Sequence, residues 1–169
     1  KGDYIMYQVW VKHLEYEISS NPMAYIYKDY GFWEKLINWS LDRAGTYEIR
    51  LWETDLDNIE NIKLLGKNIE NQDTKEVVFV GKVNDSIKNY LLQNYLTEEG
   101  YIKYFTIWFE SEGDIISSLS HYGHEIILDV SNLEESKDIK KELDSEFINV
   151  EILEYYIDED GFINAKDLI

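Results

Sequence analysis

Two histidines stand close together near the middle of the second half of the chain, His121 and His124. A spacing of three on a helix can bring two imidazoles to one metal ion, which would suit a metal-dependent hydrolase that also uses nearby acids. However, Gly123 should end a helix between them, and no third ligand is evident. The favoured interpretation is a helix C-terminus with surface histidines, so no metal site and no catalytic residue is predicted.

Residues 158–167 are similar to the middle of an EF-hand calcium loop. With Gly161 at loop position 6, Asp158 and Asp160 match the ligand positions 3 and 5. Position 1 falls on Tyr156, and the residues before it have the pattern of a strand instead of a helix. A β-turn with Gly161 at its positive-φ position is therefore favoured, and calcium binding stays open.

Other catalytic arrangements find little support in the composition. The chain has no cysteine, which excludes a disulfide framework, a thiolate metal site and a cysteine nucleophile. It has no glycine-rich phosphate loop and no Gly-x-Ser-x-Gly motif, and Arg43 and Arg50 are its only arginines. Carboxylates are so frequent that no single pair indicates acid/base catalysis. The sequence therefore predicts a protein that is not an enzyme and needs no cofactor.

Net charge and aromatic content indicate an interaction with a basic partner. The formal charge is −18, and 14 tyrosines, 6 phenylalanines and 5 tryptophans accompany it. High charge with few aromatics is typical of disorder, but here the aromatics are abundant and the chain should fold. An acidic surface repels nucleic acid and anionic membranes and attracts cationic proteins at long range. No direct binding to nucleic acid or to a membrane is expected.

The negative charge is concentrated towards the C-terminus. The net charge is −3 for residues 1–56, −4 for residues 57–112 and −11 for residues 113–169. Carboxylates that alternate with tyrosines suit a binding surface, because rigid rings provide contact area and acids steer a basic partner. The predicted partner-binding residues are Glu151, Glu154, Tyr155, Tyr156, Asp158, Glu159 and Asp160, and secondarily Glu110, Glu112 and Asp114.

Apolar periodicity predicts the elements that must position these residues. Residues 101–112 are rich in aromatic and β-branched side chains on both faces, which predicts a central strand covered on both sides. Further strands are predicted at residues 4–18 (as one long strand or a bent pair), 46–53, 76–83, 125–130 and 148–157. Helices are predicted at residues 33–44, 57–65, 87–95, 114–121 and 133–147, with an exposed loop at 66–75 and a short tail after a turn at 158–161.

Strands that alternate with helices predict an α/β or α+β fold. We expect a single layered domain over residues 1–169, with a mixed β-sheet of about six strands, some of them parallel neighbours, flanked by three to four helices. No apolar run approaches the roughly 20 residues that span a bilayer, and the first residues lack a signal-peptide pattern. The expected location is the cytoplasm.

The function predicted from these features is inhibition by occlusion. The protein would act as an immunity protein or antitoxin that covers the basic cleft of a toxin or nuclease domain, or as a DNA mimic directed against a defence protein. One alternative is a structural or adaptor domain that is acidic for solubility alone. The other is the metal-dependent hydrolase that uses His121 and His124.

Overall fold

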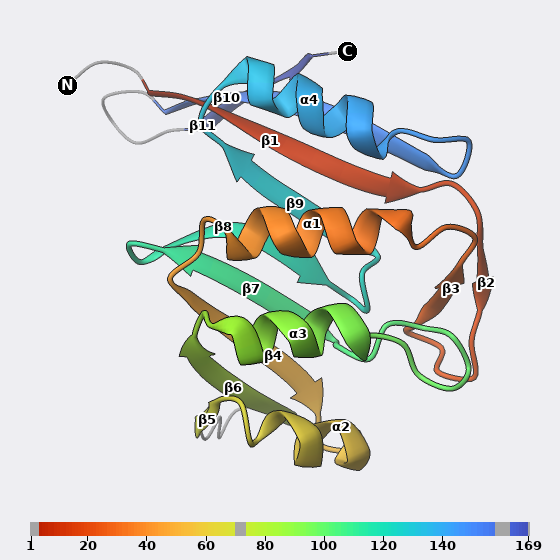
Figure 1. Cartoon of the computed structure of the whole chain (residues 1–169). Helices are drawn as coiled ribbons and strands as arrows, with labels where there is room; N and C mark the ends of the chain where they lie inside the picture. The colour runs from red at the N-terminus through yellow and green to blue at the C-terminus, as the bar shows by residue number, and fades with distance from the viewer. Residues whose placement is uncertain (1–3, 70–73, 158–162, 169) are drawn as a thin grey trace.

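One large antiparallel sheet organises the chain. The computed structural model describes residues 4–69, 74–157 and 163–168. Nine strands form the sheet in the order β11-β10-β1-β9-β8-β7-β4-β6-β5, and two short strands form a separate hairpin (Figure 1). The sheet strands are β1 (Tyr4–His13), β4 (Thr46–Trp52), β5 (Lys67–Ile69), β6 (Glu76–Lys82), β7 (Thr106–Ser111), β8 (Asp114–Ser120), β9 (Glu125–Val130), β10 (Ile148–Ile157) and β11 (Ile163–Leu168). The hairpin strands are β2 (Tyr16–Ile18) and β3 (Tyr25–Tyr27).

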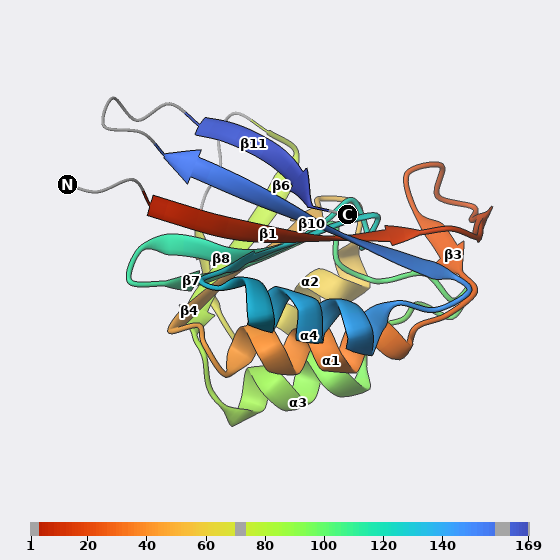
Figure 2. The ribbon, with the colours of Figure 1, turned by 90° about the horizontal axis from the view of Figure 1, so that it is seen from above.

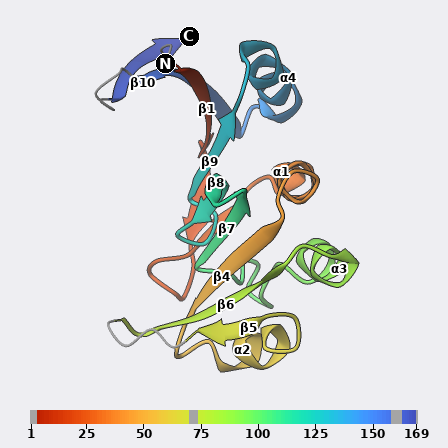
Figure 3. The same cartoon turned by 90° about the vertical axis from the view of Figure 1, so that its left-hand side faces the viewer.

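The helices lie on one side of this sheet. They are α1 (Gly31–Leu41), α2 (Leu56–Ile62), α3 (Asp85–Gln93) and α4 (Leu133–Leu143). Figures 2 and 3 show α1, α3 and α4 side by side on the same face, with α2 beside β5. We call the opposite side, which carries no helix, the open face. Two helices begin at asparagine caps: Asn84 accepts from the Ile87 N–H, and Asn132 from the Glu135 N–H.

The core lies between the sheet and its helices. Alternate side chains of each strand point to this layer, for example Val9 and Val11 of β1, which lie opposite Ile152 and Val150 of β10. On α1, buried residues recur at the spacing of one helical face: Phe32, Trp33, Leu36, Ile37, Ser40 and Leu41. The remaining alternate positions of the strands, including Trp10 and Trp108, belong to the open face.

The prediction of a layered fold that mixes helices and strands is confirmed, but three details were wrong. The sheet has nine strands instead of about six, all its described pairings are antiparallel, and helices cover one face instead of both. The strands joined through α3 and through α4 are indeed parallel to each other. However, β4 lies between β6 and β7, and β1 lies between β9 and β10. In each strand–helix–strand unit, β6-α3-β7 and β9-α4-β10, an antiparallel strand therefore lies between the two parallel strands.

Three local predictions also change. Residues 114–121 were predicted as a helix, but residues 114–120 form β8, whose register to β7 shifts at Phe109 and Glu110. This β-bulge removes the strict alternation by which a strand is recognised. The predicted strand at 101–112 begins only at Thr106, and residues 101–105 form an irregular segment. The predicted tail contains β11, which pairs with β10.

The strands at 46–52, 76–82, 125–130 and 148–157 and the helices α1 to α4 confirm the predictions for these segments to within a few residues. The prediction of an exposed loop at 66–75 was wrong in part, because Lys67–Ile69 form β5, which pairs with β6. The opening segment is the bent pair β1 and β2. Within the described residues, no helix combines the length and the apolar character that crossing a membrane would need.

Candidate functional site

The predicted binding residues of β10 do not share one surface. Glu151 and Tyr155 lie on the open face, opposite Trp10 and Met6 of β1, and Glu151 forms an ion pair of 2.6 Å with Lys12. Glu154 alternates to the other side of the sheet. Tyr156 lies on that side too, and its hydroxyl donates to the Glu154 carboxylate. Because side chains alternate between the two faces of a strand, residues that are close in sequence on β10 lie on opposite sides of the sheet.

The secondary group of predicted residues lies at the tip of the β7–β8 hairpin. Glu112 and Gly113 have φ values of 54° and 94°, which form the tight turn, with Glu110 and Asp114 on either side. Three strands, β8, β9 and β1, lie between β7 and β10. At a strand spacing of about 4.8 Å, the hairpin tip is roughly 19 Å from β10 across the sheet. It is a separate surface.

The residues Asp158, Glu159 and Asp160 lie outside the described part of the chain, and so does the first half of the segment compared with a calcium loop, residues 158–162. The residues that follow it form β11, an antiparallel neighbour of β10, where an EF-hand would continue into a helix. This pairing agrees with the interpretation of the segment as a hairpin connection.

Helix α4 does not offer a coherent acidic face, although its sequence is rich in acids. Its buried side consists of Ser136, Ile139 and Leu143. Its exposed residues include lysines as well as carboxylates, namely Glu134, Lys137, Asp138, Lys141 and Glu142. Opposite charges at spacings of three and four largely compensate each other on such a helix. The C-terminal excess of charge therefore does not produce a single anionic surface here.

The two histidines lie in the turn between β8 and β9, not at a helix end. His121 and Tyr122 have positive φ values of 52° and 57°, and His121 lies 3.4 Å from Glu125. The ring of His124 packs against both Tyr16 and Tyr25 of the hairpin, whose own rings are 4.5 Å apart. Across residues 4–69, 74–157 and 163–168, no three histidine, aspartate or glutamate side chains come close enough to hold one metal ion.

Acidic and apolar side chains do gather at the end of the sheet where β1 and β4 terminate. Four segments meet there: residues 14–30, which contain the β2–β3 hairpin, residues 53–57, residues 94–105 and the turn at 121–124 (Figure 1). We call this region the loop end. It contains eight carboxylates but two lysines, Lys28 and Lys103, and thus has a net charge of −6. The carboxylates are Glu15, Glu17, Asp29, Glu53, Asp55, Asp57, Glu98 and Glu99.

Exposed hydrophobic side chains accompany these acids. Ile18 is 75% exposed and Leu56 is 67% exposed, and Leu14, Tyr16 and Met23 are also exposed at the loop end. All three residues of β2 are exposed, whereas Tyr27 of its partner strand β3 is buried against the body of the protein. These residues belong to two of the segments that also carry the acids, and apolar area combined with charge is typical of protein-binding surfaces. The loop end has both the charge and the apolar area that a protein interface needs.

Internal contacts hold the segments of the loop end together. His13, at the end of β1, is stacked on Tyr27 with a centroid distance of 3.8 Å, and its Nε2 lies 3.0 Å from the Gly123 carbonyl. The Tyr27 hydroxyl donates to the carbonyl of Tyr122 at 3.1 Å. These contacts tie the hairpin to the β8–β9 turn. Burial lowers the pKa of His13 from 6.5 to about 4, so the ring is neutral at pH 7.

A second set of contacts ties the hairpin to residues 94–105. Glu99 accepts hydrogen bonds from the backbone N–H of Ser20 at 2.6 Å and from its hydroxyl at 2.5 Å. These hydrogen bonds lower the pKa of Glu99, because they stabilise its charged form. The Tyr30 hydroxyl donates to the Gly100 carbonyl at 2.5 Å. The loops therefore form a prearranged surface, which reduces the entropy lost on binding.

Two clefts open in this surface beside the end of β4. One of about 680 Å³ is bordered by Asp55, Asp57 and Glu98 and also by Lys103. The other, of about 420 Å³, is bordered by Met23, Trp52 and Asp55 and also by Glu53 and Lys75. They share Thr54 and Asp55. Burial raises the pKa of the Asp55 carboxyl, although its hydrogen bond from the Trp52 N–H acts in the opposite direction. A cationic side chain in either cleft would meet carboxylates and apolar groups together.

The sequence contained a signal for this site that the charge count by thirds of the chain did not use. Residues 52–57, Trp-Glu-Thr-Asp-Leu-Asp, end a strand with an aromatic residue followed by acids, and residues 95–101 contain Tyr95, Glu98, Glu99 and Tyr101. The contributing segments are far apart in sequence, and each carries only two or three acids. Only the antiparallel return of the strands brings them to one end.

Comparison with known proteins gives no family for the chain: no family model, no curated protein and no solved structure matches it.

Proposed function

We propose that this chain is an acidic binding protein that neutralises a basic protein partner by covering its cationic surface. The partner class is a toxin or nuclease domain whose Lys and Arg side chains contact nucleic acid, which would make the chain an immunity protein, an antitoxin or a DNA mimic. The loop end is the proposed binding surface. The observation that supports it is the convergence of eight carboxylates from three segments, together with exposed apolar side chains of residues 14–30 and 53–57, at one end of the sheet.

The two kinds of side chain have different roles in this proposal. Glu53, Asp57 and Glu98 are exposed, and none of them is in an ion pair among the described residues, so their charges act on the approaching partner. Such charges raise the association rate and make it dependent on salt. Ile18 and Leu56 supply apolar area that slows dissociation once the surfaces meet.

The test compares two triple variants that remove the same number of charges from opposite ends of the sheet. The loop-end variant is Glu53→Gln with Asp57→Asn and Glu98→Gln. The matched variant is Glu110→Gln with Glu112→Gln and Asp114→Asn, which removes the acids of the β7–β8 hairpin. Each variant changes the net charge by three, so a difference between them reports the position of the charge and not its amount.

The partner is captured on the immobilised chain from the source cells at low salt, identified, purified and returned to the wild type and both variants. We expect a basic protein whose nucleic-acid cleavage or binding is inhibited, with association that slows as salt rises. At 0.5–1 kcal/mol per lost charge contact, the loop-end variant should bind on the order of 10- to 100-fold more weakly, and the hairpin variant about as tightly as the wild type. Equal affinity of the loop-end variant, or a partner without a cationic surface, would contradict the proposal.

A further inference from the structure

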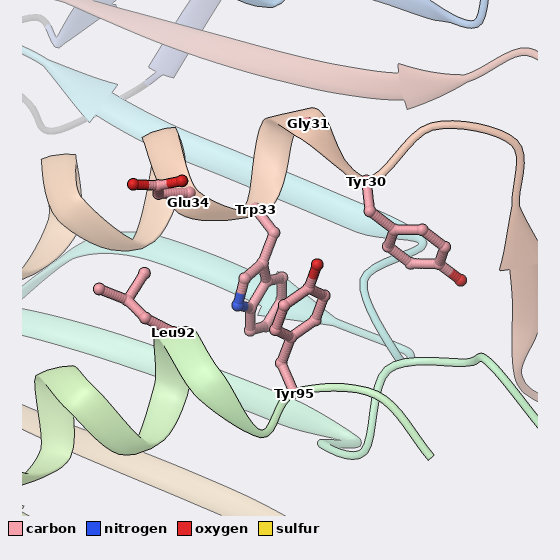
Figure 4. A pocket seen from close by; sticks show the side chains of 6 residues that line it. All are labelled: Tyr30, Gly31, Trp33, Glu34, Leu92 and Tyr95. Atoms are coloured by element: carbon pink, nitrogen blue, oxygen red, sulfur yellow. The ribbon is translucent and has the colours of Figure 1, made fainter. Parts of the chain in front are cut away.

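A cleft between α1 and α3 borders the loop end and combines aromatic rings with one carboxylate. It has a volume of about 520 Å³ and is bordered by Tyr30, Gly31, Trp33, Glu34, Leu92 and Tyr95. Figure 4 shows the Tyr95 ring lying over Trp33, with Tyr30 on one side and Glu34 on the other. Both helices are part of the core layer, so the cleft is built on regular structure and not on loops alone.

The aromatic wall of the cleft is fixed from behind. The rings of Trp33 and Tyr95 are stacked with centroids 5.0 Å apart, and Trp33 stacks in turn on buried Tyr104 at 6.2 Å. The Trp33 Nε1 donates to the carbonyl of Leu91 at 2.8 Å, which anchors it to α3. Tyr95 is only partly buried, so part of its ring remains available to a ligand.

The charge of the cleft is negative. Glu34 is exposed in the first turn of α1, and no ion pair engages it among the residues that the structure describes. Its charge lies close enough to Tyr95 to add to the effect of burial, which raises the pKa of that tyrosine. Asp29 accepts from the Gly31 N–H at 2.7 Å at the same helix end. Lys35 donates to the carbonyl of Glu142 instead.

The chain's own arginines show which cation suits such a site. The guanidinium of Arg43 lies over the ring of Trp39 at 4.5 Å and pairs with Glu135 at 2.7 Å. The guanidinium of Arg50 lies over the ring of Trp108 at 4.2 Å and pairs with two glutamates. Each arginine thus contacts an aromatic ring and a glutamate carboxylate. A planar guanidinium can stack on a ring and donate in its own plane to a carboxylate at the same time, whereas an ammonium group has no plane to stack and no forked set of donors.

We propose that the α1–α3 cleft is a receptor for an arginine side chain, held between the Tyr95 ring and the Glu34 carboxylate. The cleft presents the same two kinds of group that bind Arg43 and Arg50, an aromatic ring and a glutamate, with a tyrosine in place of the tryptophan. Among the described residues, no cation forms an ion pair with Glu34. The arginine would belong to the basic partner, so in the cell this inference rests on the proposed function. The recognition itself is a property of the cleft and is tested without the partner.

The test is an NMR titration of the ¹⁵N-labelled protein with N-acetyl-arginine amide, with N-acetyl-citrulline amide as the uncharged isostere. We expect millimolar binding of the arginine compound, with amide shifts at Gly31, Glu34, Leu92 and Tyr95, and no comparable shifts with citrulline. Glu34→Gln should weaken binding at least about fivefold, because it removes the charge and keeps the shape. Glu142→Gln, an exposed glutamate of α4, should bind as the wild type does.

A second variant, Tyr95→Leu, removes the ring and should also lose binding, while its amide spectrum away from the cleft reports whether the fold is intact. Cleft amides that do not shift, equal shifts with citrulline, or unchanged affinity of Glu34→Gln would each overturn the inference. The loop-end triple variant retains Glu34 and Tyr95 and should bind the arginine compound normally. Failure of the proposed function and failure of this inference are thus distinguishable.

Discussion

The buried imidazole of His13 should make the protein lose stability as the pH falls from 7 to 5. His13 is 9% exposed, is stacked on Tyr27 and approaches the carbonyl of Gly123. Burial is the largest cause of its lowered pKa, and the nearby His124 lowers it further, while the hydrogen bond to Gly123 opposes the shift. The unfolded chain therefore takes up a proton near pH 6.5 that the native chain does not take up until about pH 4.

The size of the effect follows from these two pKa values. Above pH 6.5 the ring is mostly neutral in both states, and His13 causes no dependence on pH. Below it, each pH unit costs about 1.4 kcal/mol until the native ring is also protonated. The loss is about 2 kcal/mol at pH 5 and about 3 kcal/mol at and below pH 4. Proteins of this size have unfolding free energies of about 5–15 kcal/mol, so the loss is measurable.

Urea unfolding at constant ionic strength, repeated from pH 7.5 to pH 4.5, measures this loss. The control is His13→Gln, whose side-chain amide can donate to the Gly123 carbonyl but cannot take up a proton. Its stability at pH 7 should be lower because the stacked ring is lost, but its unfolding free energy should fall by about 2 kcal/mol less than that of the wild type between pH 7 and pH 5. The raised pKa of Asp55 acts in the opposite direction in both proteins and is removed by the comparison.

Two results would refute this reasoning. One is an equal loss of unfolding free energy in the wild type and in His13→Gln over the same pH range. The other is an NMR titration of the His13 ring in the native protein with a midpoint near pH 6.5, which would mean that the site does not exclude the charged form. A midpoint below pH 5 would support the assigned burial.

Two further predictions concern the packing between neighbouring strands and between the sheet and α1. Gly81→Ala places a methyl group 2.5 Å from the hydroxyl of buried Tyr47, so it should lower the free energy of unfolding by about 1–3 kcal/mol in urea. Gly45→Ala, with no atom within 4 Å of the added methyl group, should change it by less than about 0.5 kcal/mol, and equal effects of the two variants would contradict the geometry. Ser117→Ala leaves the buried hydroxyl of Ser40 without its 2.7 Å partner and should cost about 1–3 kcal/mol, whereas replacing both serines by alanine should cost less than the sum of the single changes; strict additivity in thermal or urea unfolding would show that the two hydroxyls do not interact.

Local sequence patterns predicted most elements because each pattern has its own physical period. The helical face of α1 is visible in the spacing of Trp33, Leu36, Ile37 and Leu41, and α4 follows the cap Asn132. Segment 114–120 was mistaken for a helix because Ile115, Ile116 and Leu119 have helical spacing. The bulge against β7 explains why these apolar residues do not alternate.

The candidate site was predicted less well than the elements. The acids of β10 are only three residues apart, but alternation sends Glu151 and Glu154 to opposite sides of the sheet. The loop end was missed because its acids lie in segments that are separated by tens of residues, such as Glu17, Asp55 and Glu98. Counting charge along the chain cannot detect a surface that is assembled from separate segments.

By itself, the sequence determined the acidic character of the protein, the aromatic core, the four helices and the longer strands other than β8 and β11, because composition and periodicity act within a few residues of each position. Only the tertiary structure decided that β4 lies between β6 and β7 and that β1 lies between β9 and β10. It also decided that the helices cover one face of the sheet and which acids become neighbours. The physical reason is that strand order and pairing depend on contacts between distant segments, whose register is set by burying one face of each strand against α1, α3 and α4.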